Sequence, residues 1–130
     1  MGKRSAVVID DEPDITTFLE TLLTDNGWDV KSSNSPNEGL KLFESTRPDV
    51  VVLDVMMPER GGLSTLIAIR KHPELGKTPV VLLSGIQEQL TLDFRSFLDR
   101  VKAHKVSAFL DKPIDKDKLL KTLDEVTAKQ

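Results

Sequence analysis

Apolar residues along this chain gather into five short runs that are separated by longer amphipathic stretches. Three of the runs, AVVI, VVVLDV and VVLL, are continuous rather than alternating. Continuous runs rich in β-branched residues are typical of strands buried on both faces of a parallel sheet. The second run, DVKSS, is weakly apolar, and its position places it at an edge of the sheet. The predicted strands are Ser5–Ile9, Asp29–Ser32, Val50–Val55, Pro79–Leu83 and Ala108–Leu110.

Helical periodicity fills the gaps between these strands. Apolar residues recur there at intervals of three and four, which places them on one face of a helix. The third predicted helix ends before His72–Pro73. The residues that mark the first, third, fourth and fifth helices are Ile15, Phe18, Leu19, Leu22 and Leu23; Leu63, Leu66 and Ile67; Leu90, Phe94, Phe97, Leu98 and Val101; and Leu119, Leu123 and Val126.

Residues with special backbone preferences bound the first two helices. Pro13 suits the first turn of the first helix, and Asn26–Gly27 suits its left-handed carboxyl-terminal end. The tetrapeptide Ser35–Pro36–Asn37–Glu38 reads as a capping box that begins a second helix running to about Thr46.

Strands and helices therefore alternate as (βα)₅. Parallel connections of this kind are right-handed, which predicts a doubly wound α/β sandwich with helices on both faces of a five-stranded parallel sheet. The 130 residues suffice for one domain and are too few for two separate cores, so a single domain over residues 1–130 is predicted. In such folds the working site lies at the carboxyl ends of the strands.

Composition narrows the function classes. The formal net charge of −3 argues against a dedicated nucleic-acid-binding domain, and the absence of cysteine excludes disulfides and thiolate chemistry. The histidines, His72 and His104, show no metal-ligand spacing. No apolar run has the length of a membrane span or a secretory signal, so a soluble cytoplasmic protein without membrane contact is expected.

Polar residues stand at or just after four of the predicted strands. Taken singly, each reads most simply as a helix cap or a solvated loop residue. Asp54, however, lies inside the apolar run VVVLDV, where a charge is costly unless it is compensated. The strand-end residues are Asp10–Asp11–Glu12, Asp54, Ser84 and Asp111–Lys112–Pro113.

Carboxylates gathered at one edge of a sheet must take up protons or bind a cation, because two like charges about 4 Å apart repel by roughly 4 kcal/mol at an effective dielectric near 20. Mg²⁺ commonly binds one or two carboxylates, waters and a phosphate. Metal, lysine, hydroxyl and carboxylate together are the groups that a phosphoryl transfer to aspartate requires.

The strings VVIDDEPDI, VVLDVMMPERGG, PVVLLSG and AFLDKPI resemble the receiver domain of two-component response regulators. The resemblance runs in order from Ala6 to the last helix. It implies a flavodoxin-like sheet of order 2-1-3-4-5. It also implies a phosphoacceptor role for Asp54.

The resemblance further implies a role for each residue around Asp54. Asp11 would bind Mg²⁺ (or Mn²⁺) directly, Asp10 mainly through water, and Met56 through its backbone carbonyl. Lys112 would pair with the phosphoryl oxygens, and its bond to Pro113 would be cis.

Two further positions match the switch residues of the family. Ser84 matches the hydroxyl residue that swings toward the phosphoryl group, and Phe109 matches the aromatic switch. Phe109 reads equally well as an ordinary core residue. Gly61–Gly62 matches the turn after the Met-Pro dipeptide, although Arg60 stands where an apolar residue is commoner.

The implied activity is that of a signalling switch and not of an enzyme. The donor would be a sensor histidine kinase or a histidine phosphotransfer protein. Phosphorylation would change the surface made by the fourth helix, fifth strand and fifth helix. A downstream protein, a fused effector or a second copy would read that surface, without direct nucleic-acid contact.

The sequence departs from the family pattern in two ways. The stretch from Ser84 to Lys112 exceeds the usual length by something like one to two helical turns, about 3.6 residues each. The extra length predicts a longer or re-angled fourth helix that serves a particular partner or dimer contact, or else it is a harmless surface insertion. Met56 and Ile86 are apolar where polar residues can orient the hydrolytic water. This predicts a comparatively long-lived phosphorylated state.

Three alternatives stay open. A flavodoxin-like electron carrier needs hydroxyls and glycines after the first strand, where this chain has acidic residues. A haloacid-dehalogenase-type phosphatase needs a second aspartate where Met56 stands, and a cap domain. The third alternative is a degenerate receiver that binds partners without being phosphorylated.

Overall fold

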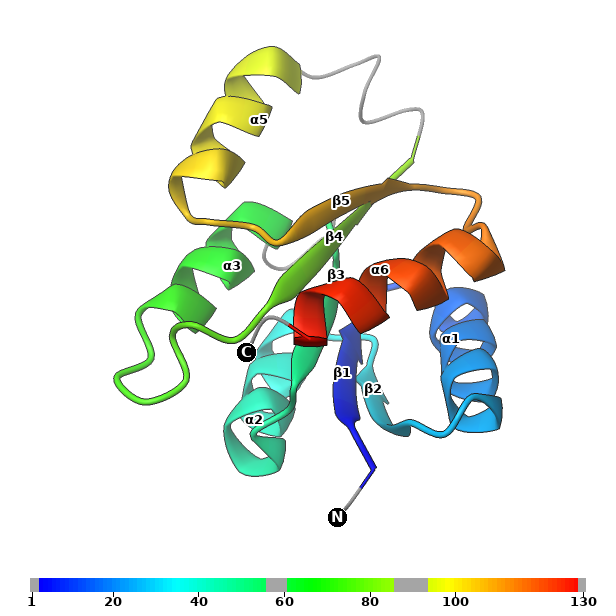
Figure 1. Cartoon of the computed structure of the whole chain (residues 1–130). Helices are drawn as coiled ribbons and strands as arrows, with labels where there is room; N and C mark the ends of the chain where they lie inside the picture. Colours follow the sequence, from blue (N-terminus) through cyan, green and yellow to red (C-terminus); the bar gives the residue numbers. More distant parts are fainter. Residues whose placement is uncertain (1–2, 56–60, 86–93, 129–130) are drawn as a thin grey trace.

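A computed structural model describes residues 3–55, 61–85 and 94–128. In these ranges a five-stranded parallel sheet has the order β2-β1-β3-β4-β5, which confirms the predicted fold class and the edge position of β2 (Figure 1). The strands are β1 Ser5–Ile9, β2 Asp29–Ser33, β3 Val50–Asp54, β4 Val80–Ser84 and β5 Ala108–Asp111.

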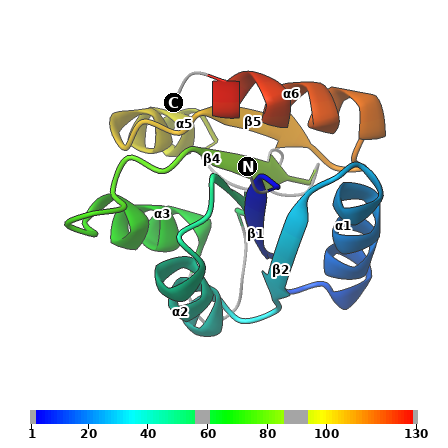
Figure 2. The same ribbon diagram turned by 60° about the horizontal axis from the view of Figure 1, so that its bottom comes forward.

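The described helices cover both faces of this sheet. Helices α1 and α6 lie on one face, and α2, α3 and α5 lie on the other (Figure 2). The helices are α1 Pro13–Asp25, α2 Pro36–Thr46, α3 Gly62–Arg70, α5 Phe94–Ala103 and α6 Lys116–Ala128. None of the helices in the described ranges is long and apolar enough to cross a membrane.

Alternate residues of the central strands enter two separate cores. Val8 and Val52 pack with Leu19 of α1 and with α6, whereas Val7 and Val51 pack beneath α2, α3 and α5. Because neighbouring side chains of a strand point to opposite faces, only a continuous apolar run fills both layers. The continuous runs were therefore a sound indicator of central strands.

The end of α1 agrees with its predicted signal. Gly27 has a positive φ of 88°, and the Trp28 N–H donates to the Leu23 carbonyl at 3.0 Å while the Gly27 N–H donates to the Thr24 carbonyl at 3.1 Å. This is a Schellman motif, in which one residue has the left-handed backbone conformation. Glycine adopts that conformation without steric cost because it has no Cβ.

Helix α2 begins at Pro36 and ends at Thr46 as predicted, but the capping box predicted at its start is wrong. Ser35 is the N-cap residue, but its side chain makes no capping hydrogen bond. The hydroxyl of Ser33 instead accepts from the Ser35 N–H at 3.0 Å and donates to the Ser35 carbonyl at 2.9 Å. The Ser33 hydroxyl thus takes the Ser35 N–H that the Glu38 side chain would bind in a capping box.

Other differences from the predicted boundaries are small. Strand β3 ends at Asp54 rather than Val55, and β4 runs from Val80 to Ser84, one residue later than predicted at both ends. Strands β2 and β5 each extend one residue further than predicted. The fourth predicted helix corresponds to α5; its predicted first apolar position, Leu90, lies outside the described residues.

Arg70, at the end of α3, connects three segments in a way that the sequence did not predict. Its guanidinium donates hydrogen bonds to four backbone carbonyls, those of Gly76, Thr78, His104 and Lys105, at 2.6 to 3.1 Å. These carbonyls belong to the segment before β4 and to the loop after α5. Burial lowers the pKa of Arg70 below its usual value. The arginine therefore anchors the carboxyl-terminal end of α5 to the body of the domain.

Candidate functional site

The parallel register brings the polar strand ends together at one edge of the sheet. Ser84 is the last residue of β4 and is paired with Asp111 of β5. The Lys112 N–H donates to the Ser84 carbonyl at 2.8 Å, and the Asp10 N–H donates to the Ser33 carbonyl at 3.2 Å. Asp54 ends β3 between them. Segments far apart in the chain thus form one pocket.

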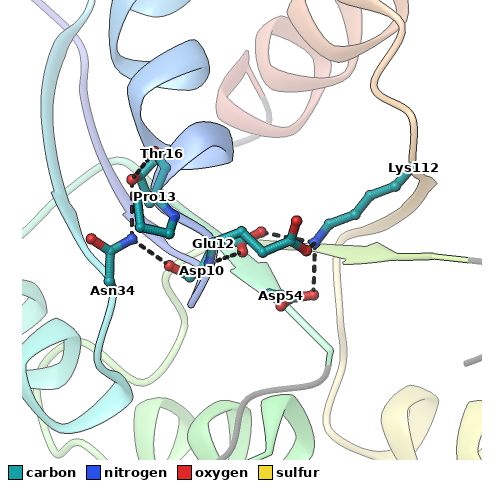
Figure 3. A network of polar contacts seen from close by, with 7 residues as sticks. All are labelled: Asp10, Glu12, Pro13, Thr16, Asn34, Asp54 and Lys112. Carbon is teal, nitrogen blue, oxygen red and sulfur yellow. Dashed lines mark hydrogen bonds and ion pairs between the residues drawn. The ribbon is translucent and has the colours of Figure 1, made fainter.

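The ammonium group of Lys112 lies among three carboxylates (Figure 3). Its Nζ donates hydrogen bonds to Oδ1 of Asp54 and Oε1 of Glu12, both at 3.2 Å. It also lies 3.0 Å from Oδ2 of Asp10. The Lys112 side chain is 13% exposed. The lysine is therefore held at the centre of the pocket by charge and by hydrogen bonds.

Asp10 is fixed from several sides. Its Oδ1 accepts a hydrogen bond from the Glu12 N–H at 2.9 Å. Its carbonyl accepts from Nδ2 of Asn34 at 2.9 Å, and the same amide group donates to the Thr16 hydroxyl at 3.1 Å (Figure 3). Asn34 thereby links the ends of β1 and β2 to the first turn of α1.

Burial and mutual repulsion disfavour the charged forms of the two inner carboxylates. Burial, together with the charge of Asp10, raises the pKa of Asp54 to about 7 despite the opposing effect of Lys112. Burial also raises the pKa of Asp10. Burial alone would lower the pKa of Lys112, but the charges of Asp54 and Asp10 outweigh it and raise that pKa. The pocket therefore holds more negative charge than one lysine compensates.

Gly62, the first residue of α3, touches the backbone of the Asp54 strand end. Its N–H donates to the Val55 carbonyl at 2.7 Å. A Cβ on Gly62 would lie 2.6 Å from the Asp54 carbonyl oxygen and 2.7 Å from Cα of Val55. Only glycine fits there, since backbone atoms cannot move aside as a side chain can. Glycine thus lets α3 approach the candidate phosphoacceptor closely.

The donor set suits a small, hard cation. Carboxylate oxygens of Asp10, Asp11, Glu12 and Asp54 all lie within 4.8 Å of one another. Oδ2 of Asp10 is buried and has no hydrogen-bond partner among the described residues, although the Lys112 ammonium is near it. An all-oxygen cluster with an unsatisfied buried oxygen is what Mg²⁺ or Mn²⁺ binds. The residues present therefore fit a divalent cation.

The structure brings together most of the side chains that the sequence singled out. Asp10, Asp54 and Ser84 are buried at the same edge, with Asp11 beside them and Lys112 reaching in. The Lys112–Pro113 peptide bond is cis, as the resemblance implied.

Phe109, the expected aromatic switch residue, is half-buried and packs against the core beneath α2, α3 and α5. Met56, Arg60 and Ile86 lie outside the described residues.

Two contributors were missed at the sequence level. Glu12 belongs to the acidic string DDE and has no predicted role of its own, yet its side chain is a direct partner of Lys112. Asn34 carries no recognisable signal, because its contacts to Asp10 and Thr16 span 24 and 18 residues of chain. The DDE string was a signal for Glu12, whereas nothing local pointed to Asn34.

Comparison with known proteins agrees with this geometry. Residues 6–124 match the response regulator receiver domain. The chain is 29% identical over 124 residues to protein PilH of Pseudomonas aeruginosa, a match covering 94% of this chain and 96% of that protein. It is 32% identical over 115 residues to the regulatory protein AtoC of Escherichia coli (strain K12) and covers 23% of that protein's length, with 87% of this chain matched.

A third relative also exceeds the chain in length. The probable transcriptional regulator ycf27 of Porphyridium aerugineum is 36% identical over 91 residues, which are 70% of this chain and 38% of that protein. The chain therefore spans less than half of the length of two of these curated relatives.

Solved structures show the same fold. Chemotaxis protein CheY4 of Vibrio cholerae superposes with a TM-score of 0.84 at 27% identity, covering 96% of this chain and 99% of that one. A response regulator receiver domain protein of Clostridium thermocellum gives a TM-score of 0.84 at 26% identity, covering 97% and 95%. With its sheet order, its acidic strand-end pocket and these matches, the chain belongs to the response regulator receiver domains of two-component systems.

Proposed function

We propose that this domain is a phosphoacceptor switch in which Asp54 receives a phosphoryl group from a histidine kinase or a histidine phosphotransfer protein. The observation that carries the proposal is the setting of Asp54. Its side chain is 2% exposed, with Oδ1 3.2 Å from the Lys112 ammonium and Asp10 as its neighbour. A carboxylate is placed there at a cost in free energy, which favours a chemical role over a structural one.

The transfer is a substitution at phosphorus. A carboxylate oxygen of Asp54 attacks the phosphorus atom, a P–O bond forms, and the P–N bond of the phosphohistidine breaks. The imidazole of the donor leaves with the bonding electron pair and takes a proton from solvent. With acetyl phosphate as the donor, a P–O bond breaks and acetate leaves. The product in both cases is an acyl phosphate on Asp54.

The chain supplies positive charge and a hydroxyl to this reaction. Lys112 stabilises the negative charge of the phosphoryl oxygens, and its place among the carboxylates keeps it aimed at the pocket. Ser84, buried at the end of β4, offers its hydroxyl to the same group. Asp10, Asp11, Asp54 and the carbonyl of Met56 would hold Mg²⁺ (or Mn²⁺). The metal supplies further neutralisation of charge on the phosphoryl oxygens.

The output passes through the surface of α5, β5 and α6. We propose that Ser84 and Phe109 move inward together once Asp54 is phosphorylated, and that this shifts the population between two packings of that surface. Phe109 lies on β5 and packs toward the layer that contains α5, which supports this route. The reader of the surface is a downstream protein, a fused effector or a second copy of the domain.

A degenerate receiver is the second candidate. It would need no intact chemistry, whereas this chain retains the two inner aspartates, the hydroxyl and the lysine in one pocket. The raised pKa of Asp54 means that its charged form lowers the stability of the fold, and a domain that only binds partner proteins would gain nothing from it. Both features favour the phosphoacceptor.

The experiment is direct. The protein is incubated with acetyl phosphate and Mg²⁺, and the intact mass is measured in the presence and absence of the metal. A single phosphoryl increment is expected, which Asp54→Asn abolishes and the exposed α1 variant Asp25→Asn retains. No increment from acetyl phosphate or from any histidine kinase would favour the degenerate receiver.

A further inference from the structure

We infer that Glu12 is a positioning residue that occupies, on the Lys112 ammonium, the place that a phosphoryl oxygen takes in the reaction. The inference rests on the proposed function and concerns how the resting pocket limits it. The Glu12 carboxylate meets the Lys112 ammonium beside those of Asp10 and Asp54, and its side chain is largely exposed (Figure 3).

In the resting state Lys112 donates hydrogen bonds to Glu12 and Asp54 and forms an ion pair with Asp10. An ammonium group carries three N–H donors. Three carboxylate oxygens lie around it, from Asp10 at 3.0 Å and from Glu12 and Asp54 at 3.2 Å. A phosphoryl oxygen that pairs with Lys112 therefore competes with these carboxylates, most directly with the two that accept hydrogen bonds from the ammonium group.

Burial decides which carboxylate gives way. The side chains of Asp10 and Asp54 are 0% and 2% exposed, while that of Glu12 is 59% exposed. Water can take up the Glu12 carboxylate at little cost, whereas a buried carboxylate that lost its cation would be left unpaired. Glu12 is therefore the partner that leaves.

The main chain of Glu12 is fixed independently of its side chain. Its N–H donates to Asp10, and its carbonyl accepts from the N–H groups of Ile15 and Thr16 at 3.1 and 3.2 Å. Replacing the carboxylate leaves all these contacts in place. The variant Glu12→Gln thus removes the negative charge from Lys112 without disturbing Asp10.

The consequence is a brake on phosphorylation. A donor phosphoryl group competes with the Glu12 carboxylate for Lys112, and the same carboxylate repels the anionic donor. Because the Glu12 side chain is largely exposed, this effect is small, and removing the carboxylate is expected to speed phosphorylation about two- to fivefold. Once Asp54 carries the phosphoryl group, Glu12 no longer holds Lys112, so dephosphorylation should not change.

The test compares wild type, Glu12→Gln and the exposed α2 variant Glu44→Gln, which makes the same change of net charge elsewhere. The second-order rate constant for acetyl phosphate, the dephosphorylation rate constant and the Kd for Mg²⁺ are measured for each. At saturating Mg²⁺, Glu12→Gln alone should raise the first constant about two- to fivefold and leave the dephosphorylation rate constant within about twofold. Glu12→Asp, which keeps the charge but shortens the reach to Lys112, should fall between Glu12→Gln and wild type.

An unchanged or lower phosphorylation rate in Glu12→Gln overturns the inference, and so does a Kd for Mg²⁺ weakened about tenfold, which is typical of a lost metal contact. A wild-type protein that acetyl phosphate and histidine kinases all fail to phosphorylate overturns the proposed function itself, and the inference with it.

Discussion

Gly62 lies against the carbonyl of Asp54 so closely that a Cβ at this position would be 2.6 Å from the carbonyl oxygen. The first turn of α3 and the end of β3 are thus in backbone contact directly beneath the candidate phosphoacceptor. Neighbouring Gly61 is different, since a Cβ there would meet its nearest atom, the Val55 carbonyl oxygen, at 3.9 Å. The pair therefore provides a matched test of close approach.

Gly62→Ala should lower the free energy of unfolding by about 1–3 kcal/mol, the usual cost of overpacking. It should also slow phosphorylation of Asp54, because the strand end must shift to admit the methyl group. Urea denaturation and the acetyl phosphate rate measure the two effects. Gly61→Ala should change neither by much; equal losses in both variants would contradict the role assigned to Gly62.

The raised pKa of Asp54 makes stability depend on pH in the metal-free protein. The pKa of Asp54 is about 7 in the folded state and about 3.8, the ordinary value of an aspartic acid, in the unfolded chain, so the folded protein holds more protons between these values. The free energy of unfolding therefore falls as pH rises through this window.

Asp54→Asn cannot lose that proton. In the presence of a chelator, it should be more stable than wild type by about 1–3 kcal/mol at pH 8, with the difference closing near pH 4. Urea denaturation at several pH values measures this dependence. An asparagine variant that is less stable than wild type at pH 8 would contradict the prediction. Asp25→Asn, which keeps Asp54, should retain the pH dependence of wild type.

Mg²⁺ should stabilise the folded protein by binding the acidic cluster. At about ten times the Kd, the gain is roughly 1.4 kcal/mol, which thermal unfolding detects as a rise in Tm. Asp10→Asn should lose most of the gain, because it removes a carboxylate whose Oδ2 lacks another hydrogen-bond partner in the described part of the chain. A gain that is equally large in Asp10→Asn would place the metal elsewhere.

Removing the guanidinium of Arg70 should release the end of α5. Arg70→Met leaves four backbone carbonyls without their donor and should cost about 2–4 kcal/mol. Arg70→Lys should recover only part of this, because one ammonium cannot reach all four. Urea denaturation measures the loss, and Arg100→Met, at an exposed position of α5, should be nearly neutral.

The phosphorylated state should be comparatively long-lived, because Met56 and Ile86 are apolar where a polar side chain can orient the hydrolytic water. Its decay is followed by the loss of the phosphoryl mass increment after the donor is removed. Met56→Asn should shorten the lifetime. A wild-type lifetime of only seconds would count against the interpretation.

Much of the fold was readable from local patterns. Continuous apolar runs located β1, β3 and β4, since a strand between two helical layers must be apolar on both faces. The dipeptide Asn26–Gly27 predicted the end of α1, and Gly27 has the positive φ that such an end requires. The capping box failed because the Ser33 hydroxyl accepts from the Ser35 N–H, the donor that the Glu38 side chain would bind in a capping box, and local sequence does not say which side chain prevails.

The sequence by itself determined the element order, the strand-end chemistry of Asp10, Asp54, Ser84 and Lys112, and the family they resemble. Each of these features depends on residues that are close together in the sequence, so a short motif is enough to predict it. Only the tertiary structure decided that Lys112 pairs with Glu12 across 100 residues, that Asn34 holds the Asp10 carbonyl, and that Arg70 anchors α5. Such contacts form between residues far apart in the sequence, once the strands and helices have packed together. The spacing of residues along the chain therefore does not predict them.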